Sequence, residues 1–384
     1  MAFDVVAFVA GFVSFYALYL AISLSLNLEF GYAGIPNFGK VLFIAAGAAI
    51  AGSVTGRVAA WALGVNTRGD FITFNFQIMG QVNQQLLGDP LLMIALVALG
   101  LAVAAAAGAI FGYVMSYPAI HLREDYLGLL LLAMAQFWFL FLTDYTPLVG
   151  ATQSILTINP YYYFSTLNVK DLVDITYAIG MGAFAIFVWF YVEKTVKSPL
   201  GRVLRAMRDN DEASSALGKD TAKMRRNTLI VASALAGMAG AMITFQYAFV
   251  GASTWTRFAW TFWPFLIVIM GGASNNKGVA LGAFFFVLIF QGLEQIQPYI
   301  APYIFNTNAS FVQDIILAGL LLGILYIRPE GILREKSTHT ISKRELEKIV
   351  GPQGAGQDAQ AGTSAGVAAN PDKSKNAKED AKPA

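Results

Sequence analysis

Long apolar runs alternate with short polar connections along most of the chain. The runs cover residues 5–27, 39–63, 91–119, 126–142, 174–192, 227–249, 259–272, 278–293 and 311–327. A helix needs about 20 apolar residues to cross the hydrocarbon core of a bilayer. The pattern therefore predicts an all-α, polytopic transmembrane helical bundle with about nine spans, or about eight to ten when broken or re-entrant helices are counted.

Two glycine-rich blocks interrupt apolar runs, at residues 31–39 and 271–278. Transporters often build the substrate pathway from interrupted helices, because unwound backbone can face the solute there. Each block also contains asparagine, so we predict that the pathway includes Gly31, Tyr32, Gly34, Asn37, Gly271, Gly272 and Asn275. The alternative is that glycine and alanine only let membrane helices pack closely, as predicted for the ALAGMAGAM stretch at 234–242.

Few ionisable residues fall inside the apolar runs. Arg57 lies within the second run, whereas Glu29, Lys40 and Glu294 lie near run ends, from which they are expected to reach the interface. The lack of a buried acidic chain counts against an ion-coupled secondary transporter or channel. Sodium sites built from uncharged oxygens leave that alternative open.

Candidate chemistry is scarce. The two histidines, His121 and His339, lie far apart without metal-ligand spacing, so no metal site is predicted. The sequence has neither a GxxxxGK[ST] phosphate loop nor a nucleophile elbow. ATP hydrolysis is therefore expected to belong to another chain, and an intramembrane enzyme is disfavoured because no cluster of catalytic polar residues is visible.

The composition agrees with a lipid environment. Of the 384 residues, 56% are hydrophobic and 13% are charged, whereas soluble chains carry roughly 25% charged residues. The formal net charge of +2 is too small to indicate a nucleic-acid partner. The chain contains no cysteine, which excludes disulfides and thiol catalysis.

Basic residues concentrate in one loop, at 194–226. They are Lys194, Lys197, Arg202, Arg205, Arg208, Lys219, Lys223, Arg225 and Arg226. Basic residues in short loops mark the cytoplasmic side. The HLRED turn at 121–125 and the C-terminus fall on the same side by parity, and the opposite loops hold only Arg68, Lys170 and Arg257. The N-terminus is expected outside, and the first run, which lacks a basic leader, is expected to remain as a span.

The same loop contains the pattern of short amphipathic helices. Ser198 and Pro199 form a helix start. The apolar residues that follow recur opposite arginines at three- and four-residue spacing, and they are Leu200, Val203, Leu204 and Met207. A second short helix is expected to end at Gly218 as a C-cap. Such a loop either rests on anionic headgroups or docks in a groove of another subunit.

The composition changes again after Arg328. The segment at 334–350 is rich in charge and is expected in the cytosol. The residues at 351–384 include almost no side chains able to form a core. This tail is therefore predicted to be a disordered, solvated appendage.

Six motifs follow one another along the chain. They are SLNLEFGYAGIPNFGKVLFIAAGA, LREDYLGLLLLAMAQF, SPLGRVLRAMRDNDEASSALG, ALAGMAGAM, VIMGGASNNKGVALGA and GLLLGILYIRPEGIL. In this order they resemble the larger membrane permease of branched-chain amino acid ABC importers, from about residue 20 to residue 333. The resemblance implies a permease domain at 1–333. The sequence departs from the family at 35–40 and 273–277, which leaves urea or short amides open as alternative substrates.

The resemblance also implies how the chain works. It implies a subunit of the plasma membrane, without a cofactor of its own, that moves branched-chain or similar hydrophobic amino acids. The implied partners are a second, smaller permease, two cytosolic ATPases that bind ATP and magnesium, and an external solute-binding protein. The E-A-S-x-x-x-G spacing matches the coupling motif of such importers, and the residues implied to couple to the ATPases are Arg202, Arg205, Asp211, Glu212, Ala213 and Gly218.

Overall fold

The computed structural model describes the residues that carry the predicted bundle. These are residues 5–67, 69–122, 124–166, 171–304, 315–319, 322–323, 326 and 330–335. They belong to one compact unit, Met1–Glu335. The predicted tail at 351–384, the charged segment beyond Glu335, His339 and the side chain of His121 lie outside the described residues.

The described chain is dominated by helices, and seven of those described are long and apolar enough to cross a membrane. They are α1 (Val5–Leu26, continued by the π-helix η1, Asn27–Tyr32), α2 (Lys40–Ala62), α4 (Pro90–His121), α5 (Glu124–Asp144), α8 (Leu172–Lys197), α11 (Thr221–Tyr247) and α13 (Asn276–Ile304). The prediction of an all-α, polytopic bundle is confirmed.

Shorter elements connect these helices. They are α3 (Asn75–Gln85), α6 (Thr146–Val149), α7 (Tyr162–Thr166), α9 (Pro199–Asp209), α10 (Asp211–Ala216), α12 (Trp263–Gly271), the 3-10 turns η2 (Ala151–Gln153) and η3 (Ala252–Thr254), the π-helix η4 (Phe258–Phe262), and the strands β1 (Ile155–Leu156) and β2 (Phe249–Val250). The two strands pair antiparallel, with Ile155 opposite Val250. They tie the connection after α5 to the end of α11.

The apolar run at 259–272 has fewer residues than the roughly 20 that a span needs. η4 and α12 together form one apolar helix over Phe258–Gly271, which is shorter than a span. It ends where Gly272 adopts a φ of 108°, a value that favours glycine because it lacks a Cβ atom. The ninth predicted run, at 311–327, lies largely outside the described residues.

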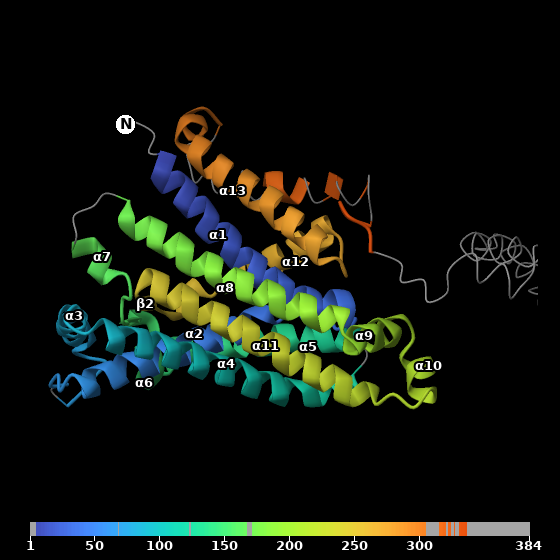
Figure 1. Cartoon of the computed structure of the whole chain (residues 1–384), viewed down its shortest axis with the longest axis horizontal. Helices are drawn as coiled ribbons and strands as arrows, with labels where there is room; N and C mark the ends of the chain where they lie inside the picture. Colours follow the sequence, from blue (N-terminus) through green and yellow to red (C-terminus); the bar gives the residue numbers. More distant parts are fainter. Residues whose placement is uncertain are drawn as a thin grey trace, which may run out of the picture. The chain divides into compact units, whose positions relative to one another are not determined.

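α11 packs against both α2 and α4 through small residues (Figure 1). A Cβ atom added at Gly47 of α2 would collide with the backbone of Gly237 in α11, and one added at Gly240 would collide with the carbonyl group of Ile44. Gly108 of α4 approaches α11 just as closely. Small residues bring membrane helices into backbone contact, so the close-packing interpretation of the glycine-rich stretch in α11 is confirmed.

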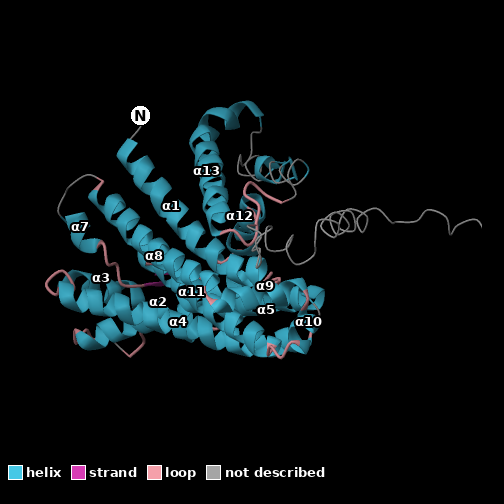
Figure 2. Cartoon of the chain, turned by 45° about the vertical axis from the view of Figure 1, so that its right-hand side comes forward, coloured by secondary structure: helices cyan, strands magenta, loops and turns pink. Residues whose placement is uncertain are grey.

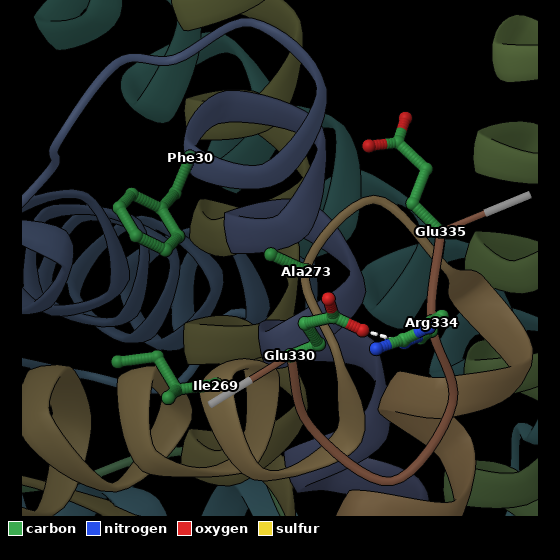
Figure 3. A pocket seen from close by; sticks show the side chains of 6 residues that line it. All are labelled: Phe30, Ile269, Ala273, Glu330, Arg334 and Glu335. Carbon is green, nitrogen blue, oxygen red and sulfur yellow. Dashed lines mark ion pairs between the residues drawn. The ribbon is translucent and has the colours of Figure 1, made fainter. Parts of the chain in front are cut away.

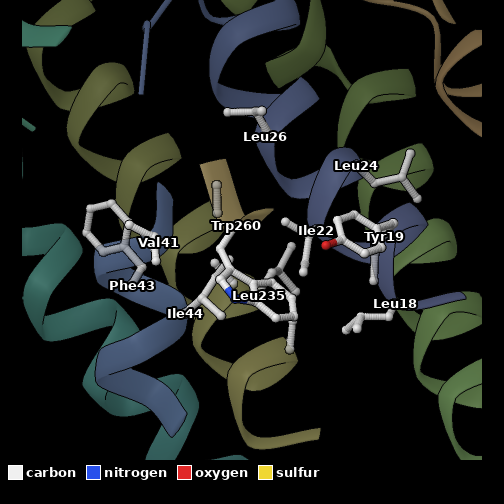
Figure 4. Close-up of a cluster of buried hydrophobic side chains, with 14 of the residues drawn as sticks. Leu18, Tyr19, Ile22, Leu24, Leu26, Val41, Phe43, Ile44, Leu235 and Trp260 are labelled. Carbon is white, nitrogen blue, oxygen red and sulfur yellow. The ribbon is translucent and has the colours of Figure 1, made fainter. Parts of the chain in front are cut away.

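Large side chains fill the space around α1, which packs against α8, α12 and α13. Figure 4 shows part of this cluster, with Tyr19 and Ile22 of α1 near Trp260 of η4. The rings of Tyr19 and Trp260 stack with centroids 5.9 Å apart and an interplanar angle of 4°. Ile22 and Leu24 are fully buried. The half-length helix is thereby anchored to the first span.

The connections gather at two opposite ends of the helices. α3 and α7 lie at one end, and α9 and α10 lie at the other in both views (Figures 1 and 2). The basic loop at 194–226 is therefore separated from the loops that are poor in basic residues. Which end faces the cytoplasm stays a prediction.

Candidate functional site

The basic loop folds into two helices, and we call residues 198–218 the α9–α10 hairpin. Ser198 Oγ accepts a hydrogen bond from Leu200 N at 3.2 Å, so the helix start predicted at this serine is confirmed. α9 packs against α8 and buries Leu204 and Met207. Leu204 and Met207, on the apolar side of α9, thus face protein.

α10 presents an exposed edge. Asn210 Oδ1 accepts a hydrogen bond from Ala213 N at 2.9 Å where the helix begins. Gly218, with a φ of 76°, ends it, so the predicted glycine cap is confirmed. Glu212, Ala213 and Gly218 are exposed, and the neighbouring Leu217 is 80% exposed. These four residues form the exposed edge of α10.

The other residues predicted to couple to ATPases differ in exposure. Arg202 is exposed. Asp211 Oδ2 pairs with Arg225 Nη2 of α11 at 3.2 Å. The guanidinium group of Arg205 lies 5.3 Å from the centroid of the Tyr32 ring, within cation–π range. Asp211 and Arg205 therefore tie the hairpin to the bundle.

The two glycine-rich blocks meet, and we call their contact the helix-break junction. Ser274 N donates to Asn27 Oδ1 at 2.9 Å, and Ser274 Oγ donates to Gly31 O at 2.6 Å. Asn27 Nδ2 donates to Asn276 Oδ1 at 3.0 Å. The π-helical end of α1 is thus joined to the turn between α12 and α13. Unwound backbone between membrane helices is stable where partner groups in the protein satisfy its hydrogen bonds, as these side chains do here.

A short segment, residues 330–335, adds backbone to the second break. Ile332 N donates to Met270 O at 2.9 Å, and Leu333 N donates to Gly271 O at 3.1 Å. Both acceptors belong to the last turn of α12, whose carbonyl groups have no partner within the helix. The segment therefore acts as a backbone cap for the half-length helix.

Gly272 and Asn275 hold this segment in place. A Cβ atom at Gly272 would collide with the carbonyl group of Leu333. Asn275 Nδ2 donates to Arg334 O at 2.9 Å. Both residues were predicted to line a pathway, and in the structure both contact the 330–335 segment.

A cavity of about 480 Å³ lies beside the same segment. Figure 3 shows the residues that line it, which are Phe30, Ile269, Ala273, Glu330, Arg334 and Glu335. Arg334 pairs with Glu330, and the carboxylate of Glu335 points away from Arg334. Glu335 pairs instead with α9, where its Oε2 lies 2.9 Å from Arg208 Nη2.

Arg208 connects the α9–α10 hairpin to both helix breaks. Its Nη1 donates to Gly31 O at 2.9 Å and also to Ser274 Oγ. Burial lowers the pKa of Arg208, but hydrogen bonds to Glu335 and Asp209 more than offset this and raise its pKa above the ordinary value. Arg208 therefore stays charged at every physiological pH.

A second polar cluster corrects the prediction for Glu29 and Lys40. Both side chains are fully buried, and Lys40 Nζ lies 2.9 Å from Glu29 Oε2. Asn37 Nδ2 donates to the same oxygen at 3.0 Å, and Lys40 Nζ also donates to Ala232 O at 3.3 Å. The expectation that both charges reach the interface is wrong, because the π-helical turn places Glu29 opposite the first turn of α2.

The structure thus divides the predicted pathway residues. Most of them lie at the junction or in contact with α9 and the 330–335 segment, and these are Gly31, Tyr32, Gly34, Gly271, Gly272 and Asn275. Asn37 belongs to the buried Glu29–Lys40 cluster. The space at Gly31 is filled, since a Cβ atom there would collide with the Asn27 side chain. A role of these residues in transport stays a prediction.

Comparison with known proteins identifies the family. Residues 8–325 match the family described as the branched-chain amino acid transport system / permease component. The chain belongs to this family. The resemblance carried by the six sequence motifs is therefore confirmed, and the permease is a multi-pass membrane transport subunit rather than an enzyme.

Two relatives define the similarity. The permease is 34% identical over 344 residues to the probable branched-chain amino acid transport permease protein LivM of Methanocaldococcus jannaschii, which covers 88% of this chain and 96% of the relative. It is 23% identical over 243 residues to the high-affinity branched-chain amino acid transport system permease protein LivM of Escherichia coli. This alignment covers 58% of this chain and 54% of the relative. No solved structure matches the permease.

Sequence reasoning missed several residues of the junction. Arg208 was recognised as part of the polar side of α9 but not as a contact to other helices. Ser274 and Asn276 lie in the stretch at 273–277 that departs from the family, and that departure was the available signal. Glu335 lies 127 residues from Arg208 in the chain, so no local pattern indicated their pairing.

Proposed function

We propose that the permease is the membrane-spanning subunit of an ATP-driven importer that carries branched-chain or similar hydrophobic amino acids across the plasma membrane. The observation that carries this proposal is the similarity to the M. jannaschii relative, which extends over 96% of that protein. The exposed edge of α10 supports it, because an importer without a nucleotide site of its own needs a surface on which an ATPase can act.

We infer that ATP and magnesium are bound by partner chains. The proposed assembly contains a second, smaller permease, two cytosolic ATPases and an external solute-binding protein. In this assembly the N-terminus lies outside and the C-terminus lies in the cytoplasm. The concentration of basic residues in the loop that forms the α9–α10 hairpin supports this orientation.

The proposed mechanism is a rigid-body displacement. When ATP closes the ATPase pair, the α9–α10 hairpin moves with the subunit on which it docks, through Glu212, Ala213, Leu217 and Gly218. The permease then changes its access from outside to inside. No covalent bond forms or breaks in this chain.

Purification of the tagged permease from its native membrane tests this assembly, with mass spectrometry of the bound proteins and uptake of radiolabelled leucine. We expect two ATPases and a second permease to copurify. In the variant with both Glu212→Arg and Leu217→Asp, we expect ATPase recovery and uptake to fall at least about tenfold, because both exposed positions then present altered charge to the docking groove.

Gln84→Arg is the matched control, because Gln84 is exposed on α3 at the opposite end of the helices. We expect this variant to retain bound ATPases. If wild-type permease is recovered without ATPases although they are expressed, or if the double variant takes up leucine normally, the importer proposal is wrong. In the wild-type permease, competition of excess valine, isoleucine or urea with the uptake of radiolabelled leucine identifies the substrate class.

A further inference from the structure

Arg208 makes a set of contacts that no other residue of α9 is shown to make. Its guanidinium group reaches the first helix break at Gly31 O, the second break at Ser274 Oγ and the carboxylate of Glu335. A planar guanidinium group has five N–H donors in a fixed arrangement. One rigid group therefore connects three segments that are far apart in sequence.

The backbone of the first break lies directly on the Arg208 side chain. Gly34 has a φ of 69°, and a Cβ atom there would lie 2.9 Å from Arg208 Cγ. Contact through the aliphatic part of the side chain thus adds to the hydrogen bond at Gly31. A movement of α9 toward or away from the bundle must displace the 31–34 backbone or break these contacts.

Glu335 joins the 330–335 segment to α9. Its carboxylate pairs with Arg208 at 2.9 Å and with Arg205 Nε at 3.5 Å. The same segment is bonded to the end of α12 through Ile332 and Leu333. Contacts through Glu335 therefore link α9 to α12 by a second route, which does not involve Ser274.

We propose that Arg208 is the positioning residue that carries movement of the α9–α10 hairpin to both helix breaks, with Glu335 as its counter-charge. This inference rests on the proposed function, in which the hairpin docks on an ATPase. Arg202 on the same helix is exposed. Arg208 instead contacts the bundle at Gly31 and Ser274, so the two arginines have different surroundings.

The test compares ATP hydrolysis with transport in the complete complex, copurified from native membranes and reconstituted in liposomes. In Arg208→Lys the positive charge is kept, but one ammonium group cannot reproduce the fork that spans Gly31, Ser274 and Glu335. We expect the number of leucine molecules imported per ATP hydrolysed to fall about tenfold or more, while ATP hydrolysis and subunit recovery stay near wild type. Glu335→Gln should lower the same ratio by a smaller factor.

Arg257→Lys is the matched control, because Arg257 is exposed in the connection between α11 and α12. Its ratio of import to hydrolysis should equal that of wild type. An unchanged ratio in Arg208→Lys would overturn the inference, and so would a parallel loss of assembly, hydrolysis and uptake, because that result indicates a purely structural arginine. A wild-type complex without ATP-driven uptake contradicts the proposed function itself, so the two failures are distinguishable.

Discussion

Lys40→Met is expected to destabilise the permease by about 3–5 kcal/mol. The substitution removes the ammonium group that pairs with Glu29 at 2.9 Å, where both side chains are fully buried. The remaining carboxylate keeps its hydrogen bond from Asn37 but loses its counter-charge in surroundings of low dielectric constant. The effect is measured by heating the purified permease in detergent and monitoring the loss of its monodisperse peak in size-exclusion chromatography.

The double variant Glu29→Gln with Lys40→Met distinguishes the effect of the two charges from the effect of the volume that the side chains fill. Glutamine retains an oxygen that can accept from Asn37, and the variant leaves no unpaired charge. Removing both charges of a buried ion pair often leaves folding stability nearly unchanged, whereas removing one charge lowers it strongly. We therefore expect the double variant to recover most of the lost stability. If Lys40→Met unfolds at the wild-type temperature, the buried ion pair does not exist in the membrane protein.

Gly240→Ala is expected to destabilise the permease by about 1–3 kcal/mol or more. The added methyl group meets the carbonyl oxygen of Ile44 in α2, which is backbone and cannot rotate away. α2 and α11 must then separate, and the small residues that pack along them lose contact. The unfolding temperature should fall clearly in the assay described for Lys40→Met.

Gly182→Ala provides the control for helix propensity. Gly182 lies inside α8, and a Cβ atom at this position has nothing within 4 Å. Alanine is the better helix former by roughly 1 kcal/mol, so this variant should be neutral or slightly stabilised. Equal unfolding temperatures for the two alanine variants would show that the α2–α11 contact is looser than described.

Features of the fold that depend on local chemistry could be predicted from the sequence. The apolar runs predicted the spans because lipid requires about 20 apolar residues in each. Ser198 with Pro199 and the glycine at 218 predicted the limits of short helices, since caps act within one turn. The run at 259–272 is too short for a span, and it forms a helix of about half that length.

Features that depend on distant pairing could not be predicted. Asn27 and Asn276 are 249 residues apart, and nothing near either one indicates its partner. The two glycine-rich blocks were predicted as interruptions of apolar runs, but their direct contact was not predicted. Glu29 and Lys40 lie at the ends of apolar runs, where charges usually reach water. In the structure Glu29 lies in the π-helical turn and pairs with Lys40, and both side chains are buried.

The 330–335 segment also decides where the folded permease ends. The match to the family described above ends at residue 325, whereas the compact unit extends to Glu335. A protein trimmed to the family boundary would lack the donors that cap α12 and the carboxylate that holds Arg208. A purification tag or fluorescent fusion therefore belongs after Glu335, because a shorter version removes the contacts of this segment with α12 and Arg208.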